Sequence, residues 1–116
     1  MILVIDDNQD LANLFCEYLT YQDHNATAAY SGEQGIAIAK EREPKVILCD
    51  IAMAGMDGYE VARCIRRDDS LKHIQLIALS GFSSQHDVQR SLEAGFDRHL
   101  SKPVDLGEMK KMLDGC

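Results

Sequence analysis

Residues 2–7 read Ile2-Leu3-Val4-Ile5-Asp6-Asp7, a short apolar run that ends in two acids. A continuous apolar run with β-branched residues is typical of a strand buried on both faces of a parallel sheet. The pattern recurs at residues 46–49, which Asp50 follows, and at residues 74–79, which Ser80 follows. The carboxyl ends of parallel strands share one edge, where open α/β folds bind their ligands. We therefore expect the chemistry of this protein at that edge.

Segments with helical periodicity alternate with these runs. Residues 25–30 and 97–101 predict two further strands, and Lys102 follows the second of them. Right-handed crossovers between parallel strands place helices on both faces of the sheet. The sequence thus predicts a three-layer α/β/α sandwich around a five-stranded parallel sheet, flavodoxin-like, with strand order 2-1-3-4-5.

Helix starts and faces can also be predicted. Asn8, Ser31 and Asp57 are placed to cap the first three helices, Ser83 or Ser84 the fourth, and Asp105 opens the last. The cap role is sufficient for Asp57, to which we assign no chemistry. Gly95 fits the position that closes the fourth helix. Apolar side chains recur at helical spacing and are expected to face the core, among them Leu11, Leu14, Phe15 and Tyr18 in the first helix and Val88 and Leu92 in the fourth.

Length and charge limit the possible functions. A chain of 116 residues predicts one domain over residues 1–116, with no internal linker. Its net charge of −7 makes direct binding to nucleic acid or insertion at an anionic membrane unfavourable. No signal-peptide pattern or membrane-spanning run is present in the sequence, so we expect a cytoplasmic protein.

The four cysteines suggest no metal or redox chemistry. Cys16, Cys49, Cys64 and Cys116 form no CxxC motif and have no histidine pair nearby. We expect Cys49 and Cys64 to be small core residues, as free cysteines usually are.

The strand-end residues predict a specific chemistry when they are taken together. Asp6, Asp7 and Asp50 would repel one another without a cation, and Lys102 supplies only one positive charge. The remaining excess suits Mg²⁺, which prefers oxygen ligands. A metal, an ammonium and a hydroxyl such as that of Ser80 can together stabilise phosphoryl transfer. Asp50, the central acid, is the candidate nucleophile that becomes an aspartyl-phosphate.

With these residues in place, the chain resembles a response-regulator receiver domain over nearly all of its length. The resemblance rests on four motifs in their order, Val4-Ile5-Asp6-Asp7-Asn8, Asp50 with Gly55-Met56-Asp57-Gly58, Ala78-Leu79-Ser80-Gly81, and Lys102-Pro103. Taken singly, each would be read as a turn, a helix cap or a surface charge. Their joint occurrence at strand ends is what makes the resemblance specific.

The resemblance implies a role for each residue. Asp6 and Asp7 would bind Mg²⁺, and Asp50 would accept phosphate from a histidine kinase or a histidine phosphotransfer domain. Ala52 would lend its backbone carbonyl to the metal. Ser80 and Lys102 would be the switch hydroxyl and the phosphate-binding lysine. The resemblance also implies a cis Lys102–Pro103 peptide bond and a downstream partner protein that the sequence does not identify.

Three features depart from the usual pattern or refine it. Ala54 stands where a proline is common, so the loop after Asp50 is expected to be less rigid. His99 occupies the position of an aromatic switch residue, and it reads equally well as a half-exposed strand histidine. The stretch from His99 to Asp105 resembles receivers of hybrid histidine kinases more than those of DNA-binding regulators.

Other functions fit the sequence less well. A flavodoxin-like cofactor domain would not place Asp6 and Asp7 beside a flavin phosphate. A haloacid-dehalogenase-type phosphatase needs a second acid where this chain has Ala52. A degenerate receiver that only binds partners would usually have lost an acid or the lysine. We therefore expect a signalling switch that catalyses its own phosphorylation and slow dephosphorylation, without being a metabolic enzyme.

Overall fold

The chain folds into five strands that alternate with five helices. The computed structural model describes residues 1–81 and 85–114. The elements run β1 (Ile2–Ile5), α1 (Gln9–Tyr21), β2 (Ala26–Ala29), α2 (Gly32–Arg42), β3 (Val46–Asp50), α3 (Gly58–Arg67), β4 (Gln75–Ser80), α4 (Gln85–Ala94), β5 (Arg98–Ser101) and α5 (Leu106–Asp114). No helix within the described ranges is long and apolar enough to cross a membrane.

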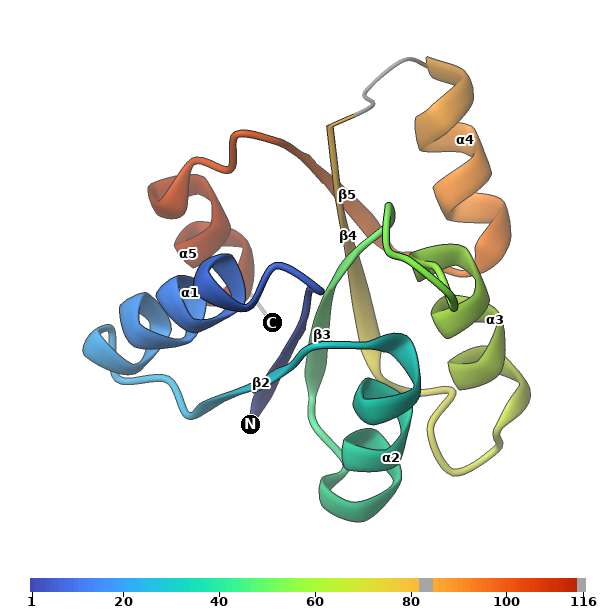
Figure 1. The fold of residues 1–116 in the computed structure, drawn as a ribbon, viewed down its shortest axis with the longest axis horizontal. Coiled ribbons are helices and arrows are strands. Elements are labelled where there is room, and N and C mark those ends of the chain that lie inside the picture. The colour runs from blue at the N-terminus through green and yellow to red at the C-terminus, as the bar shows by residue number, and fades with distance from the viewer. Residues whose placement is uncertain (82–84, 115–116) are drawn as a thin grey trace.

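The strands form one parallel sheet in the order β2-β1-β3-β4-β5 (Figure 1). The predicted fold class and strand order are therefore confirmed. Several strand boundaries differ by one residue from those predicted from the sequence. For example, β4 begins at Gln75 and includes Ser80, and β5 begins at Arg98. In the register of the sheet, Asp50 pairs with Leu79 and Ser80 pairs with Ser101, so the ends of β3, β4 and β5 lie level.

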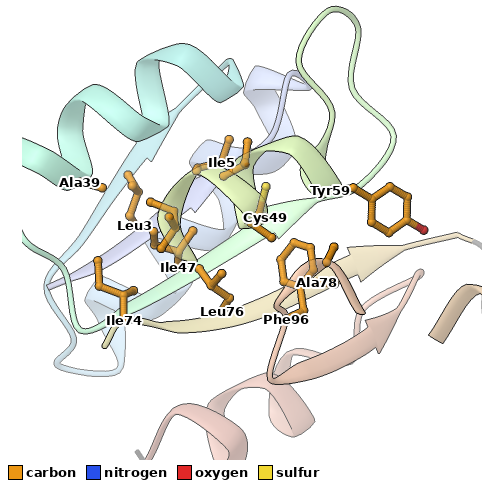
Figure 2. Close-up of a cluster of buried hydrophobic side chains, with 14 of the residues drawn as sticks. Leu3, Ile5, Ala39, Ile47, Cys49, Tyr59, Ile74, Leu76, Ala78 and Phe96 are labelled. Carbon is orange, nitrogen blue, oxygen red and sulfur yellow. The ribbon is translucent and has the colours of Figure 1, made fainter. Parts of the chain in front are cut away.

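Alternate residues of each central strand face opposite layers. Leu3 and Ile5 of β1 belong to a cluster with side chains of α2, α3 and α4, part of which is shown in Figure 2. Ile2 and Val4 belong to a second cluster with side chains of α1 and α5. Each central strand is buried on both faces because it contributes to two cores, which explains the continuous apolar runs in the sequence.

Predicted helix caps are present where the structure describes them. The side-chain oxygens of Asn8, Ser31 and Asp57 accept hydrogen bonds from the backbone N–H three residues on, at 3.1, 3.1 and 2.9 Å. The side chain of Gln34, in the first turn of the same helix, accepts from the N–H of Tyr30 at 2.8 Å. Gly95 has the positive φ expected at the end of α4. The predicted caps Ser83 and Ser84 lie outside the described residues.

Three side chains are less buried than the sequence predicted. Leu14 and Leu92 are 51% and 47% exposed. Ala12, Phe15 and Leu19 form the buried face of α1, and Ser91 and Ala94 that of α4. Cys49 is fully buried as expected, whereas Cys64 is only half-buried. Burial raises the pKa of the Cys49 thiol, with Asp50 and Asp6 adding to the effect, so this thiol stays protonated.

One arginine joins three segments near the amino-terminal edge of the sheet. The Arg66 guanidinium, on α3, donates to the carbonyl of Gly95 at 2.9 Å and to the carboxylate of Asp97 at 2.8 Å. It also donates to the carbonyls of Lys72 and Ile74, both at 2.7 Å. Asp97 in turn accepts from the N–H of Leu76. These bonds connect the end of α3, the start of β4 and the turn between α4 and β5.

Candidate functional site

The predicted site residues meet at the carboxyl edge of the sheet. Asp6 follows β1, Asp50 and Ser80 are the last residues of β3 and β4, and Lys102 follows β5. The backbone N–H of Lys102 donates to the carbonyl of Ser80 at 2.8 Å, which extends the β4–β5 ladder beyond the last strand residue. The Lys102–Pro103 peptide bond is cis, as expected.

Three carboxylates converge at this edge. Asp6, Asp7 and Asp50 each present an oxygen within 4.8 Å of those of the other two. Asp6 and Asp50 are buried, and Asp7 is exposed. The repulsion among such carboxylates is relieved by nearby positive charge or by a raised pKa that keeps one of them protonated.

Backbone amides orient two of these acids. One oxygen of Asp6 accepts from the N–H of Asn8 at 3.0 Å, and Asp7 accepts from the N–H of Ala54 at 3.2 Å. The other oxygen of Asp6, Oδ2, is buried and has no hydrogen-bond partner within the described part of the chain. An unpartnered buried carboxylate oxygen fits a position that a cation completes.

Lys102 supplies the nearest positive charge. Its Nζ atom lies 3.1 Å from Oδ1 of Asp50 and 3.5 Å from Oδ2 of Asp6. The Lys102 side chain is 27% exposed, whereas the side chains of Asp50 and Asp6 are 7% and 1% exposed. Lys102 therefore reaches inward from the rim and leaves two of the three acid charges unbalanced.

The pKa of Asp50 is raised above its ordinary value. Burial is the main cause, and the neighbouring charge of Asp6 adds to it. Hydrogen bonding and charge from Lys102 and a hydrogen bond from the backbone of Ala52 act in the opposite direction. Any further cation at the site would lower this pKa and favour the ionised, nucleophilic carboxylate.

The loop after Asp50 is fixed to the sheet at its base. The N–H of Ile51 donates to the carbonyl of Leu79, and the N–H of Gly58 donates to the carbonyl of Ile51, each at 3.0 Å. A Cβ at Gly58 would lie only 2.5 Å from the carbonyl oxygen of Asp50, so only glycine allows α3 to begin this close to the end of β3. Ala52 is exposed at the top of the loop.

Ser80 and His99 lie on neighbouring strands beside this cluster. Ser80 is 3% exposed. His99 pairs with Ala78 in the sheet register and is half-buried, and its Nε2 atom is buried without a hydrogen-bond partner among residues 1–81 and 85–114. The histidine ring is therefore directed partly into the protein, and its role as a switch stays a prediction.

Sequence reasoning did not identify the amides of Asn8 and Ala54 as the groups that orient the acids, or Gly58 as a close approach. The pair Asp57-Gly58 before a helix was the available signal for the glycine. A backbone N–H carries no sequence signature, so the contacts of Asp6 and Asp7 could not have been predicted.

A cavity of about 440 Å³, larger than the one beside Ala52, lies at the opposite edge of the sheet. Its walls include Met1, Asp23, His24, Lys45 and Leu113. Neither the acid cluster nor Lys102 contributes to it, so size alone does not indicate the site.

Comparisons with known proteins agree with this geometry. The model of the family described as response regulator receiver domain matches residues 2–114. The chain is 37% identical over 103 residues to the transcriptional regulatory protein AfsQ1 of Streptomyces coelicolor, covering 89% of this chain but only 44% of that protein. It is 28% identical over 105 residues to the polar-differentiation response regulator DivK of Brucella anthropi, covering 90% of this chain and 85% of DivK.

Solved structures share the fold. The chemotaxis protein CheY4 of Vibrio cholerae superposes with a TM-score of 0.93 at 23% identity, over 98% of this chain and 95% of CheY4. The signal receiver domain of a signal transduction histidine kinase from Syntrophus aciditrophicus gives a TM-score of 0.89 at 26% identity, over 98% and 86% of the two chains. With its fold, its strand-end acids and its lysine, the chain belongs to the response regulator receiver domain family of two-component signalling.

Proposed function

We propose that Asp50 accepts a phosphoryl group from a histidine kinase or a histidine phosphotransfer protein and that the phosphorylated chain presents a changed surface to a downstream protein. The observation that carries this proposal is the position of Lys102, whose ammonium lies between the buried carboxylates of Asp50 and Asp6. This position offsets the repulsion between the two acids, and it is also where a lysine can bind the oxygens of a phosphoryl group on Asp50.

The chain's own residues divide the work of the transfer. A carboxylate oxygen of Asp50 attacks the phosphorus of a phosphohistidine, the new O–P bond forms, and the P–N bond breaks as the imidazole leaves. Lys102 and the hydroxyl of Ser80 bind the phosphoryl oxygens. A later attack by water on the same phosphorus restores Asp50 and releases inorganic phosphate. The switch thus phosphorylates and dephosphorylates itself and turns over no metabolite.

The donor set fits Mg²⁺, with Asp6, Asp7 and Asp50 as carboxylate ligands and the backbone carbonyl of Ala52 as a further one. The buried, unpartnered Oδ2 of Asp6 supports this fit. When bound, the ion would neutralise the charge that develops on the phosphoryl oxygens. Oxygen ligands alone favour a hard cation over zinc or copper.

The output and the setting of the domain are part of the proposal. We propose a protein partner rather than nucleic acid for this chain, because its net charge is −7. We further propose that the whole chain is one receiver domain, of the type found in hybrid histidine kinases, and that it acts in the cytoplasm. The 26% identity to the receiver domain of a histidine kinase supports that type.

The test is a phosphorylation assay with matched aspartate variants. Wild type should be labelled by a phosphorylated kinase from a purified panel and by a small acyl phosphate with Mg²⁺. Asp50→Asn should abolish labelling. Asp69→Asn is the control, because this exposed carboxylate lies between α3 and β4 and outside the cluster, so labelling should persist. Labelling of the Asp50→Asn variant would show that another residue is the acceptor.

A further inference from the structure

A second cavity, of about 380 Å³, lies beside the proposed phosphorylation site. Ala52 and its neighbours in the loop after Asp50 form one wall, Asp57 and Tyr59 at the start of α3 form another, and Asp87 and Arg90 of α4 complete it. The cavity therefore lies beside the residues that follow Asp50, between the loop that carries Ala52 and α4. Figure 1 shows that α4 is a helix of the outer layer.

An internal cation already lies against the aromatic ring of this cavity. The guanidinium carbon of Arg90 lies 4.4 Å from the centroid of the Tyr59 ring, within the range of a cation–π contact. Tyr59 is 6% exposed, and Figure 2 shows its ring at one end of the core cluster, directed away from the other labelled side chains. Tyr59 is thus a fixed platform, whereas Arg90 is an exposed side chain that covers it.

The charges around the platform also favour a cation. Asp57 and Asp87 both line the cavity, and Arg90 is the one basic side chain in its described lining. The adjoining edge carries Asp6, Asp7 and Asp50 against Lys102. Anything that approaches this face meets more negative than positive charge, so a partner that docks here must bring basic groups.

We propose that this cavity binds an arginine or lysine side chain of the phosphodonor protein, which takes the place of Arg90 on the Tyr59 ring when that protein docks at Asp50. The inference rests on the proposed function, in which a protein delivers the phosphoryl group. A donor that brings its histidine to Asp50 must cover the adjacent Ala52. Ala52 contributes only a methyl group to the lining, which leaves room for a side chain flanking the donor histidine. Arg90 shows the chemistry that the cavity accepts.

The binding step can be tested without any phosphoryl group. Methylguanidinium is titrated into the Mg²⁺-free protein while the backbone amide NMR signals of Ala52 and Asp57 are followed. Arg90→Ala removes the internal competitor and should bind the probe several-fold more tightly than wild type. Arg98→Ala is the matched control, because it removes an equal charge from an exposed arginine that does not line the cavity, and it should bind like wild type.

Two double variants test whether Tyr59 and Asp57, which line the cavity, contribute to binding of the probe. Tyr59→Leu in the Arg90→Ala background removes the platform and should abolish the gain in affinity. Asp57→Asn in the same background keeps the helix cap but removes one charge, so it tests the cavity even if the tyrosine variant folds poorly. It should weaken binding of the probe. Equal binding by Arg90→Ala, Arg98→Ala and wild type would overturn the proposal. Saturable binding of inorganic phosphate to wild type that is lost in Arg90→Ala would overturn it too, since the cavity would then be an anion site.

The partner is tested by competition. With a kinase that labels wild type, methylguanidinium should slow transfer from the kinase to the Arg90→Ala variant and leave transfer from a small acyl phosphate unchanged. Equal effects on the two donors would overturn the assignment to a protein side chain. Failure of every donor to label Asp50 would instead contradict the proposed function, and the binding titration would still decide whether the cavity accepts a cation.

Discussion

Lys102 and Asp50 form the closest ion pair of the acid cluster, with 3.1 Å between Nζ and Oδ1, and the same ammonium lies 3.5 Å from Asp6. One lysine is therefore shared by two buried carboxylates, while the third acid, Asp7, faces solvent. In the described residues, three carboxylates at this edge are therefore balanced by the single positive charge of Lys102. The first three predictions follow from this imbalance.

Removing the lysine should destabilise the protein. Lys102→Ala leaves Asp6 and Asp50 buried without their partner, and we expect a loss of about 2 kcal/mol in the free energy of unfolding at pH 7, because Lys102 is partly solvated. Urea denaturation measures this loss. Lys111→Ala, which removes an exposed lysine from α5, should change stability by less than about 0.5 kcal/mol. Equal stability of the two variants would mean that the Lys102 contacts contribute nothing.

Acidification should favour the folded state through Asp50. Its pKa is raised in the folded protein, mainly by burial, so the folded state binds a proton more readily than the unfolded chain. The carboxyl group then costs no stability below its ordinary pKa of 3.8, and it lowers stability as the pH rises through the raised folded-state pKa.

The comparison that isolates this effect is wild type against Asp50→Asn, with the free energy of unfolding measured between pH 4 and 7. The advantage of Asp50→Asn should be largest at pH 7 and should shrink toward pH 4. A difference that does not vary with pH would contradict a raised pKa at this residue.

Magnesium should stabilise the protein by binding the assembled acids. Asp7→Asn removes one repelling carboxylate, so its melting temperature without metal should rise by about 4 °C for each kcal/mol gained. The same change removes a ligand and should blunt the further rise on addition of Mg²⁺. Thermal unfolding with and without Mg²⁺ tests both statements, and an unchanged metal response would exclude Asp7 from the site.

The ring of His99 should report on phosphorylation through Ser80. A phosphoryl group on Asp50 should attract the Ser80 hydroxyl and vacate space that the partly buried ring can enter. Histidine ring NMR signals, recorded with and without a phosphoryl mimic, should therefore shift in wild type and not in Ser80→Ala. If His99 shifts equally in both proteins, or in neither, the hydroxyl does not gate the ring.

The Arg66 network should be one of the most sensitive points outside the site. Arg66→Ala removes four donated hydrogen bonds and leaves the partly buried carbonyls of Gly95 and Ile74 without this donor. We expect a loss of about 3 kcal/mol, since hydrogen bonds from a charged group are stronger than neutral ones. Arg63→Ala, an exposed arginine on the same helix, is the control and should cost less than about 0.5 kcal/mol.

The sequence was sufficient to predict the order of the strands and the position of the residues at their carboxyl ends. Asp6, Asp50 and Ser80 could be placed together because each directly follows or ends a buried apolar run, and parallel strands end at one edge. The buried faces of α1 and α4 were harder to predict. Leu14 and Leu92 fit the apolar pattern of a helix but are exposed, whereas Ala12 and Ala94 are buried. Arg66 could not have been predicted, because most of its acceptors are backbone carbonyls.

The Arg66 bonds also restrain one end of α4. They hold its carboxyl end at Gly95, while Asp87 and Arg90, nearer its amino end, line the same cavity as Ala52 in the loop after Asp50. The helix is thus anchored at the end farther from Asp50. A change beside Asp50 should therefore tilt α4 about Gly95 rather than slide it, so that the largest displacement falls at the end nearest Asp50.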